Sequence, residues 1–112
     1  MTAAAAVSRA LAAENAQAGA PRLADAELRE LLRTLDGWTL AGATIEKSFT
    51  FAGYADTIAF VNAVAWIAQR LDHHPDLVVG FNRCRVLWTT HDAKGVTRND
   101  CIAAARVEQL FA

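Results

Sequence analysis

Residues 71–91 read LDHHPDLVVGFNRCRVLWTTH, and this stretch predicts a helix end followed by a β-hairpin. Pro75 cannot continue a helix, so the preceding element ends before it. The continuous apolar run Leu77–Phe81 predicts a strand, and Asn82-Arg83 is typical of a turn. Residues Cys84 to Trp88 then alternate between inward and outward positions, which predicts the partner strand of an antiparallel hairpin.

Outward from this hairpin, hydrophobic periodicity predicts three helices and two further strands. The helices are expected at Asp25–Leu35, at Tyr54–Asp72 and after Thr97, and the strands at Trp38–Leu40 and Ile45–Phe51. Strands joined by short turns pair antiparallel. The expected fold class is therefore α+β, a four-stranded antiparallel sheet with helices packed on one face.

The expected helix Tyr54–Asp72 has more apolar surface than one sheet can cover. Phe60, Trp66 and Ile67 extend its main apolar stripe around the cylinder. A chain of 112 residues also has a small core, for which self-association is an ordinary remedy. We therefore expect a homo-oligomer.

The first twenty residues are rich in alanine and contain no aromatic residue. A short helix is possible there, but no apolar stripe anchors it to a core. We expect residues 1–20 to be a mobile tail without a signal peptide, followed by one domain over residues 21–112.

Composition excludes several classes of protein. Hydrophobic residues make up 54% and charged residues 21%, which is typical of a globular chain and not of a disordered one. The net charge of −1 argues against nucleic-acid binding, and no apolar run is long enough to predict a membrane span. Two cysteines, Cys84 and Cys101, are typical of buried reduced thiols in a cytoplasmic protein.

The chain has three histidines, at positions 73, 74 and 91. A hairpin returns the end of its second strand beside the start of its first, so His91 should lie close to His73 and His74. Imidazole is the side chain best suited to proton transfer near neutral pH, so this cluster predicts general acid–base catalysis. Surface histidines without a function remain an alternative interpretation.

Other kinds of site are less well supported by the sequence. Adjacent histidines rarely direct both rings at one ion, and no two histidines stand four apart on a helix, so no metal site is expected. Cys84 and Cys101 lie within regular elements and not beside a base. No glycine-rich loop precedes a helix, which argues against phosphate or dinucleotide binding.

Several of these residues match a known family. The segment Leu71–Asp76 is followed by Phe81, by Thr89–Ala93, by Gly95 and by Asp100. Together with Gly37-Trp38 and the strand Ile45–Phe51, this pattern resembles pterin-4a-carbinolamine dehydratases. The resemblance covers about residues 25–111.

The resemblance implies loss of water from a 4a-hydroxytetrahydropterin, giving the quinonoid dihydropterin, without metal or cofactor. It also implies dimers or tetramers. The family histidines correspond to His73, His74 and His91, of which His73 and His91 are expected to be the acid and base and His74 to bind and orient. Thr89 and Thr90 are expected to offer main-chain groups to the flat pterin ring, and Asp72 and Asp100 are expected to orient an imidazole. For Asp72 and Asp100, capping of helix ends is an equally good interpretation.

One residue departs from the family pattern. Gln69 stands four residues before His73, where active members usually carry an ionisable side chain. This departure keeps a second function open, that of a weakly active or inactive relative. The sequence also resembles such relatives. One branch is a carboxysome-associated assembly factor for Rubisco, and another family role is that of a dimerisation cofactor of a transcription factor. The expected location is the cytoplasm. If the protein is a Rubisco assembly factor, association with the carboxysome is expected.

Overall fold

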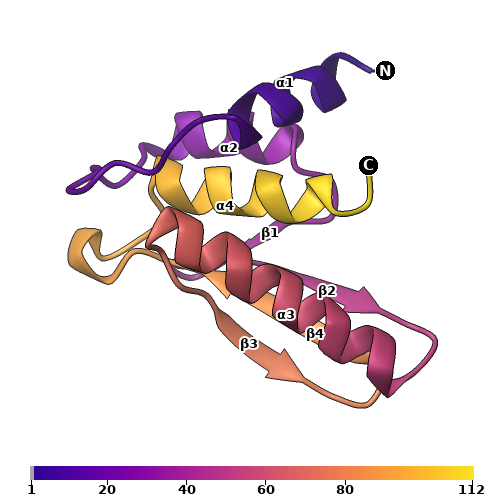
Figure 1. The fold of residues 1–112 in the computed structure, drawn as a ribbon. Coiled ribbons are helices and arrows are strands. Elements are labelled where there is room, and N and C mark those ends of the chain that lie inside the picture. Colours follow the sequence, from indigo (N-terminus) through magenta and orange to yellow (C-terminus); the bar gives the residue numbers. More distant parts are fainter. Residues whose placement is uncertain (1) are drawn as a thin grey trace.

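The computed structural model describes residues 2–112 as an open antiparallel sheet covered by helices on one face (Figure 1). The strands are β1 (Thr39–Ala41), β2 (Thr44–Thr50), β3 (Asp76–Val79) and β4 (Arg83–Trp88), in the spatial order β1-β2-β4-β3. The helices are α1 (Ala3–Ala12), α2 (Asp25–Arg33), α3 (Tyr54–Leu71) and α4 (Arg98–Gln109), with a short 3₁₀ turn, η1, at His91–Ala93. The predicted fold class is confirmed.

The hairpin β3–β4 forms at the predicted place, with Leu77 opposite Val86 and Val79 opposite Cys84. The first strand of the hairpin, predicted to run to Phe81, ends earlier, at Val79. Gly80 already belongs to the turn and donates its N–H to the carbonyl of Arg83. Phe81 consequently lies in the turn and is exposed. The alternation on β4 is as predicted: Cys84, Val86 and Trp88 are fully buried beneath the helices.

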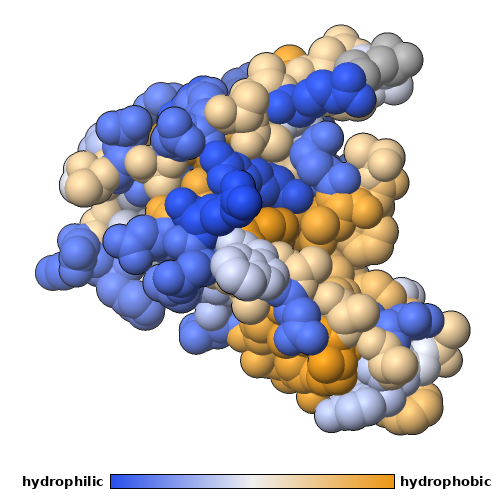
Figure 2. All heavy atoms as spheres, viewed as in Figure 1, coloured by the Kyte–Doolittle hydropathy of each residue, from blue (hydrophilic) through white to orange (hydrophobic). Residues whose placement is uncertain are grey.

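Helix α3 covers the sheet with its apolar stripe, of which Val64, Ala68 and Leu71 are buried. Phe60 belongs to this buried side, and Ile67 is half-buried against the core. Trp66, in contrast, points away and is 69% exposed. On the face shown in Figure 2, hydrophobic residues gather over α3 and over the C-terminal end of α4.

The N-terminal segment differs from its prediction. Residues Ala3–Ala12 form helix α1, which lies along α4, and Leu11 is only 2% exposed within the main core (Figure 1). The expectation of a tail without an anchor is therefore wrong. Helix α4 is covered by the sheet and α3 on one side and by α1 on the other, so that its consecutive Ala103, Ala104 and Ala105 are all fully buried.

None of the helices described within residues 2–112 combines the length and apolar character that crossing a membrane requires.

Candidate active site

The C-terminal end of α3 delivers the first two histidines to the edge of the sheet. Asp72 adopts a left-handed conformation with φ of 50°, which aspartate tolerates better than most residues. The chain then turns back, and the N–H of His73 donates to the carbonyl of Ala68. This is the pattern of a helix end closed by a left-handed residue, and it directs His73 back toward α4.

The returning end of β4 delivers the third histidine. After Trp88 the chain continues through Thr89 and Thr90 into η1, which begins with His91. An isolated bridge pairs Thr90 with Gly95 and closes this loop. The hairpin thus brings His91 back beside the end of α3, as its register requires.

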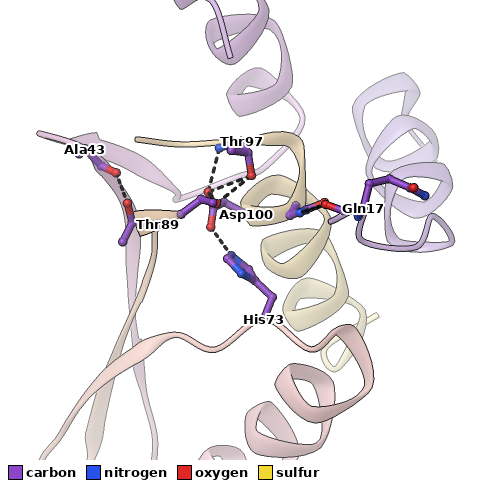
Figure 3. Close-up of polar contacts among 8 residues, drawn as sticks. Gln17, Ala43, His73, Thr89, Thr97 and Asp100 are labelled. Atoms are coloured by element: carbon purple, nitrogen blue, oxygen red, sulfur yellow. Dashed lines mark hydrogen bonds and ion pairs between the residues drawn. The ribbon is translucent and has the colours of Figure 1, made fainter. Parts of the chain in front are cut away.

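Asp100, on the first turn of α4, links the end of α3 to the loop that follows β4. Its carboxylate is fully buried and accepts hydrogen bonds from the N–H of Thr97 and the hydroxyl of Thr90, both at 2.8 Å. Its second oxygen lies 2.5 Å from Nε2 of His73 (Figure 3). Asp100 is therefore both the helix cap and the partner of an imidazole, which the sequence presented as alternatives.

The ring of His73 is held in one orientation. It stacks on Trp88 with ring centroids 5.6 Å apart and an interplanar angle of 17°, and its side chain is 15% exposed. An ionised carboxylate only accepts hydrogen bonds, so beside Asp100 the proton of a neutral His73 lies on Nε2. Nδ1 is then the ring nitrogen left to accept a proton.

A cavity of about 280 Å³ lies where these elements meet. It is lined by Asp72, His73, His74, Thr89, Thr90, His91 and Asp92. The three histidines thus share one pocket, and His74 and His91 are exposed within it. Asp100 does not line the pocket but lies behind His73. We call this cavity the histidine pocket.

Thr89 and Thr90 differ in which of their main-chain groups are already hydrogen-bonded. Both main-chain groups of Thr90 are used in the loop, since its N–H donates to Gly95 and its carbonyl accepts from Ala93 and Gly95. The expectation that the Thr90 main chain offers free groups to a pterin is therefore wrong. The hydroxyl of Thr89 donates to the carbonyl of Ala43 at 2.5 Å, and its main chain has no partner within residues 2–112.

The sequence did not single out two residues of this region, Trp88 and Asp92. Trp88 supports the His73 ring, and its signal was its inward position in the alternation of β4. Asp92 lines the pocket immediately after His91. Gln69 is exposed on α3 and lines neither this cavity nor the larger one described next.

A second, larger cavity of about 610 Å³ adjoins the histidine pocket and shares Asp72, His73, Thr90 and Asp92 with it. Its other wall is the segment Ala16–Arg22, which joins α1 to α2. The cleft as a whole therefore has a histidine side and an N-terminal side.

The cysteines are poor candidates for chemistry. Both are fully buried and unbonded. Burial raises the pKa of the Cys84 thiol, and burial together with the neighbouring Asp100 carboxylate raises that of Cys101 to about 12. Neither thiol is ionised near neutral pH. Within residues 2–112, no three His, Cys, Asp or Glu side chains are grouped so as to hold a metal ion.

Comparison with known proteins identifies the family to which this chain belongs. The family described as pterin 4 alpha carbinolamine dehydratase matches residues 21–110. A protein of Nitrosospira multiformis named for this dehydratase is 53% identical over 91 residues, which are 81% of this chain and 80% of the relative. A relative of the same name in Chromobacterium violaceum is 50% identical over 95 residues, which are 85% of this chain and 88% of the relative. The chain therefore belongs to the pterin-4a-carbinolamine dehydratase family.

Solved structures agree with this assignment. A transcriptional coactivator/pterin dehydratase from Brucella melitensis matches with a TM-score of 0.78 and 34% identity, over 81% of this chain and 99% of the other. A pterin dehydratase-like protein described as a RuBisCO assembly factor in the alpha-carboxysome matches with a TM-score of 0.54 and 24% identity, over 65% and 84%. The second likeness concerns the fold alone.

Proposed function

We propose that the protein catalyses the loss of water from a 4a-hydroxytetrahydropterin, giving the quinonoid dihydropterin. The observation that carries the proposal is the histidine pocket, in which three imidazoles line one cavity and one of them is fixed by a buried carboxylate. Membership of the dehydratase family supports the same reaction.

The reaction requires one proton to be given and one to be taken. A protonated imidazole donates to the hydroxyl oxygen on C4a, and the C4a–O bond breaks as water leaves. A neutral imidazole takes the proton from the adjacent ring nitrogen, whose electron pair forms the new C=N bond. Two positioned imidazoles are suited to these two transfers near neutral pH.

We assign the base to His73 and the acid to His91. Nε2 of His73 is committed to Asp100, which leaves Nδ1 to accept a proton. His91 is exposed and can exchange protons with water between turnovers. His74 is the binding and orienting residue. Asp72 and the main chain of Thr89 are available to accept or donate hydrogen bonds to the flat pterin ring.

The test is the rate of water loss from a freshly generated carbinolamine. The wild-type protein should accelerate it, and His91→Ala and His73→Ala should each lower the catalysed rate by roughly 10²–10⁴-fold. Asn62→Ala is the control, because Asn62 is exposed on α3 outside both cavities. Variants as active as wild type would contradict the assignment.

Gln69 supplies a second test. Gln69→Glu restores the acidic character usual at this position in active relatives. If the wild type is inert, a gain of rate in Gln69→Glu would show that the histidines can act once a carboxylate stands at this exposed position of α3, outside both cavities. An inert wild type with no gain in the variant would overturn the enzymatic function.

A second candidate function is a weakly catalytic or non-catalytic assembly role, including assembly of Rubisco. Gln69 and a set of exposed aromatic side chains favour it: Trp66 is 69%, Phe81 69% and Tyr54 56% exposed. Tyr54 and Phe81 stack on one another with centroids 6.4 Å apart. In this function the exposed aromatic residues, and not the histidines, determine binding to the partner protein.

Self-association into a dimer or tetramer is compatible with either function. Covering a large exposed side chain such as Trp66 is worth roughly 1.5–3 kcal/mol, which favours assembly. Light scattering at micromolar concentration should report an oligomer, and Trp66→Ser should weaken it. A monomeric wild type would contradict this part of the proposal.

A further inference from the structure

Trp88 stacks on His73 but lines neither the histidine pocket nor the larger cavity. We propose that Trp88 is a positioning residue, which fixes the proton-accepting orientation of the His73 imidazole and stabilises the positive charge that the ring acquires. This inference rests on the proposed function, because it takes His73 as the base.

Strand register brings Trp88 to this place. It is the last residue of β4, it lies directly opposite Ile45 of β2, and it is fully buried on the inward side of the strand. The next two residues, Thr89 and Thr90, already line the histidine pocket. Trp88 is therefore the point at which the packed core of the sheet reaches the histidines.

Trp88 and Asp100 hold the His73 ring in perpendicular directions. An imidazole N–H lies in the plane of its ring, so the 2.5 Å contact between Nε2 and the Asp100 carboxylate fixes the ring within that plane. The indole of Trp88 lies nearly parallel to the same ring, at 17° and with centroids 5.6 Å apart, and limits its tilting out of the plane. Together the two contacts fix the direction of Nδ1.

The indole face is also suited to the charge that the proposed reaction places on His73. When Nδ1 takes a proton, the ring becomes an imidazolium. The face of an indole attracts a cation within about 6 Å of its centroid, and the attraction is stronger away from water. Here the separation is 5.6 Å, Trp88 is fully buried, and the His73 side chain is 15% exposed. Trp88 therefore stabilises the protonated ring from its face while Asp100 does so from its edge.

The indole N–H indicates that packing alone does not account for Trp88. Nε1 of Trp88 is buried and has no hydrogen-bond partner within residues 2–112. A buried donor without a partner lowers stability, and a phenylalanine would avoid this loss. Trp38 also has an unpaired Nε1, and its aromatic neighbour is Phe49. At Trp88 the aromatic face against His73 is what offsets the unpaired donor.

The experiment compares the wild type with Trp88→Phe and Trp88→Leu. Phenylalanine keeps an aromatic face without the N–H, and leucine keeps only an apolar side chain. Val86→Ala is the matched control, because Val86 is fully buried on the same side of β4 and lies outside both cavities. Turnover of a freshly generated carbinolamine gives kcat and KM, and proton exchange with water at Nε2 of His73, measured by NMR, reports how firmly the ring is held.

Trp88→Leu should lower kcat roughly tenfold and leave KM nearly unchanged, because the lost stabilisation concerns a charge that forms only during proton transfer. Its Nε2 proton should exchange faster, since the ring can tilt away from Asp100. Trp88→Phe should recover most of both properties, and Val86→Ala should keep both although it is less stable. A folded Trp88→Leu with wild-type kcat and exchange, or equal losses of kcat in Trp88→Phe and Trp88→Leu, would overturn the inference.

A tetrafluorinated tryptophan placed at position 88 covers the case in which Trp88→Leu does not fold. It keeps nearly the shape of the indole, while fluorine withdraws electron density from the ring face that attracts the cation. A severalfold loss of kcat at an unchanged melting temperature is expected. An unchanged kcat would overturn the stabilisation of charge by Trp88.

The two measurements separate this inference from the proposed function. A wild type without turnover would overturn the dehydratase function, and proton exchange would then decide the role of Trp88: faster exchange in Trp88→Leu supports it, and unchanged exchange overturns it. Turnover in the wild type, with equal kcat and exchange in Trp88→Leu, would overturn the role of Trp88 and support the dehydratase.

Discussion

The two sides of the cleft are built in opposite ways. The histidine side is made of reactive side chains at the ends of α3 and β4, and its residues form a sequence motif. The N-terminal side is made of small residues in a turn, with no motif, and is held by polar contacts from α4. The chemistry and the shape of one cleft therefore come from different parts of the chain, which the turn Thr97–Asp100 joins.

The largest effect should come from breaking the histidine side at Asp100. Asp100→Ala removes a fully buried carboxylate and leaves the N–H groups of His73 and Thr97 without their acceptor. We expect a loss of about 3–5 kcal/mol in the free energy of unfolding, measured in urea, because buried partners are left unpaired.

Asp100→Asn is the matched control for this change. It keeps the size of the side chain and one oxygen for the Thr97 N–H, so a loss of only about 1–2 kcal/mol is expected. If Asp100→Ala were as stable as wild type, Asp100 would not organise the site.

The N-terminal side should respond less. Leu11→Ala removes a 2% exposed side chain from the contact between α1 and the core, and should lower the free energy of unfolding by about 2–3 kcal/mol. Val7→Ala, at a 47% exposed position of the same helix, should cost well under 1 kcal/mol. Equal stability of the two variants in thermal or urea unfolding would restore the interpretation of residues 1–20 as an unanchored tail.

The smallest effect concerns the ion pair that anchors the N-terminal side. The hydrogen bond from Arg98 holds the pKa of Glu14 below its ordinary value of 4.5. A lowered pKa in the folded state means that the stabilisation is present above the ordinary value and is lost as the pH falls through the lower one. Glu14→Gln should therefore lower the free energy of unfolding at pH 7 by at most about 1 kcal/mol, since the pair is largely exposed. The difference from wild type should vanish in acid; a difference that grows in acid would contradict the role of this pair.

Local patterns were sufficient for most of the fold. The hairpin, the buried side of α3 and the cap formed by Thr97 and Asp100 depend on residues close in sequence. Each appears at the predicted place, although β3 ends at Val79 and not at Phe81. The docking of α1 depends on contacts such as Arg106 to Ala12, which are far apart in sequence and leave no periodic signal. One signal was available: the run Cys101–Ala105 is apolar around the whole helix, which indicates cover on more than one side.

The site, like the fold, combines features that local patterns predict with features that depend on long-range contacts. Convergence of His91 with His73 and His74 was predictable from hairpin register, and the structure places all three in one pocket. Their catalytic roles stay predictions. The bond between Asp100 and His73 depends on how α4 packs against the end of α3, a long-range contact that spacing alone does not fix. The engaged main chain of Thr90 was likewise invisible, because it depends on the bridge to Gly95.

Imidazole nitrogen NMR shows whether the three histidines form one pterin-binding site. The chain contains three histidines, and three single His→Gln variants assign the resonances of each ring. During titration with a 6-methyl-7,8-dihydropterin, resonances of His73, His74 and His91 should all shift along one binding curve, and neutral His73 should carry its proton on Nε2. Saturating pterin that leaves these resonances unmoved, or a His73 proton on Nδ1, would contradict a shared pterin site organised by Asp100.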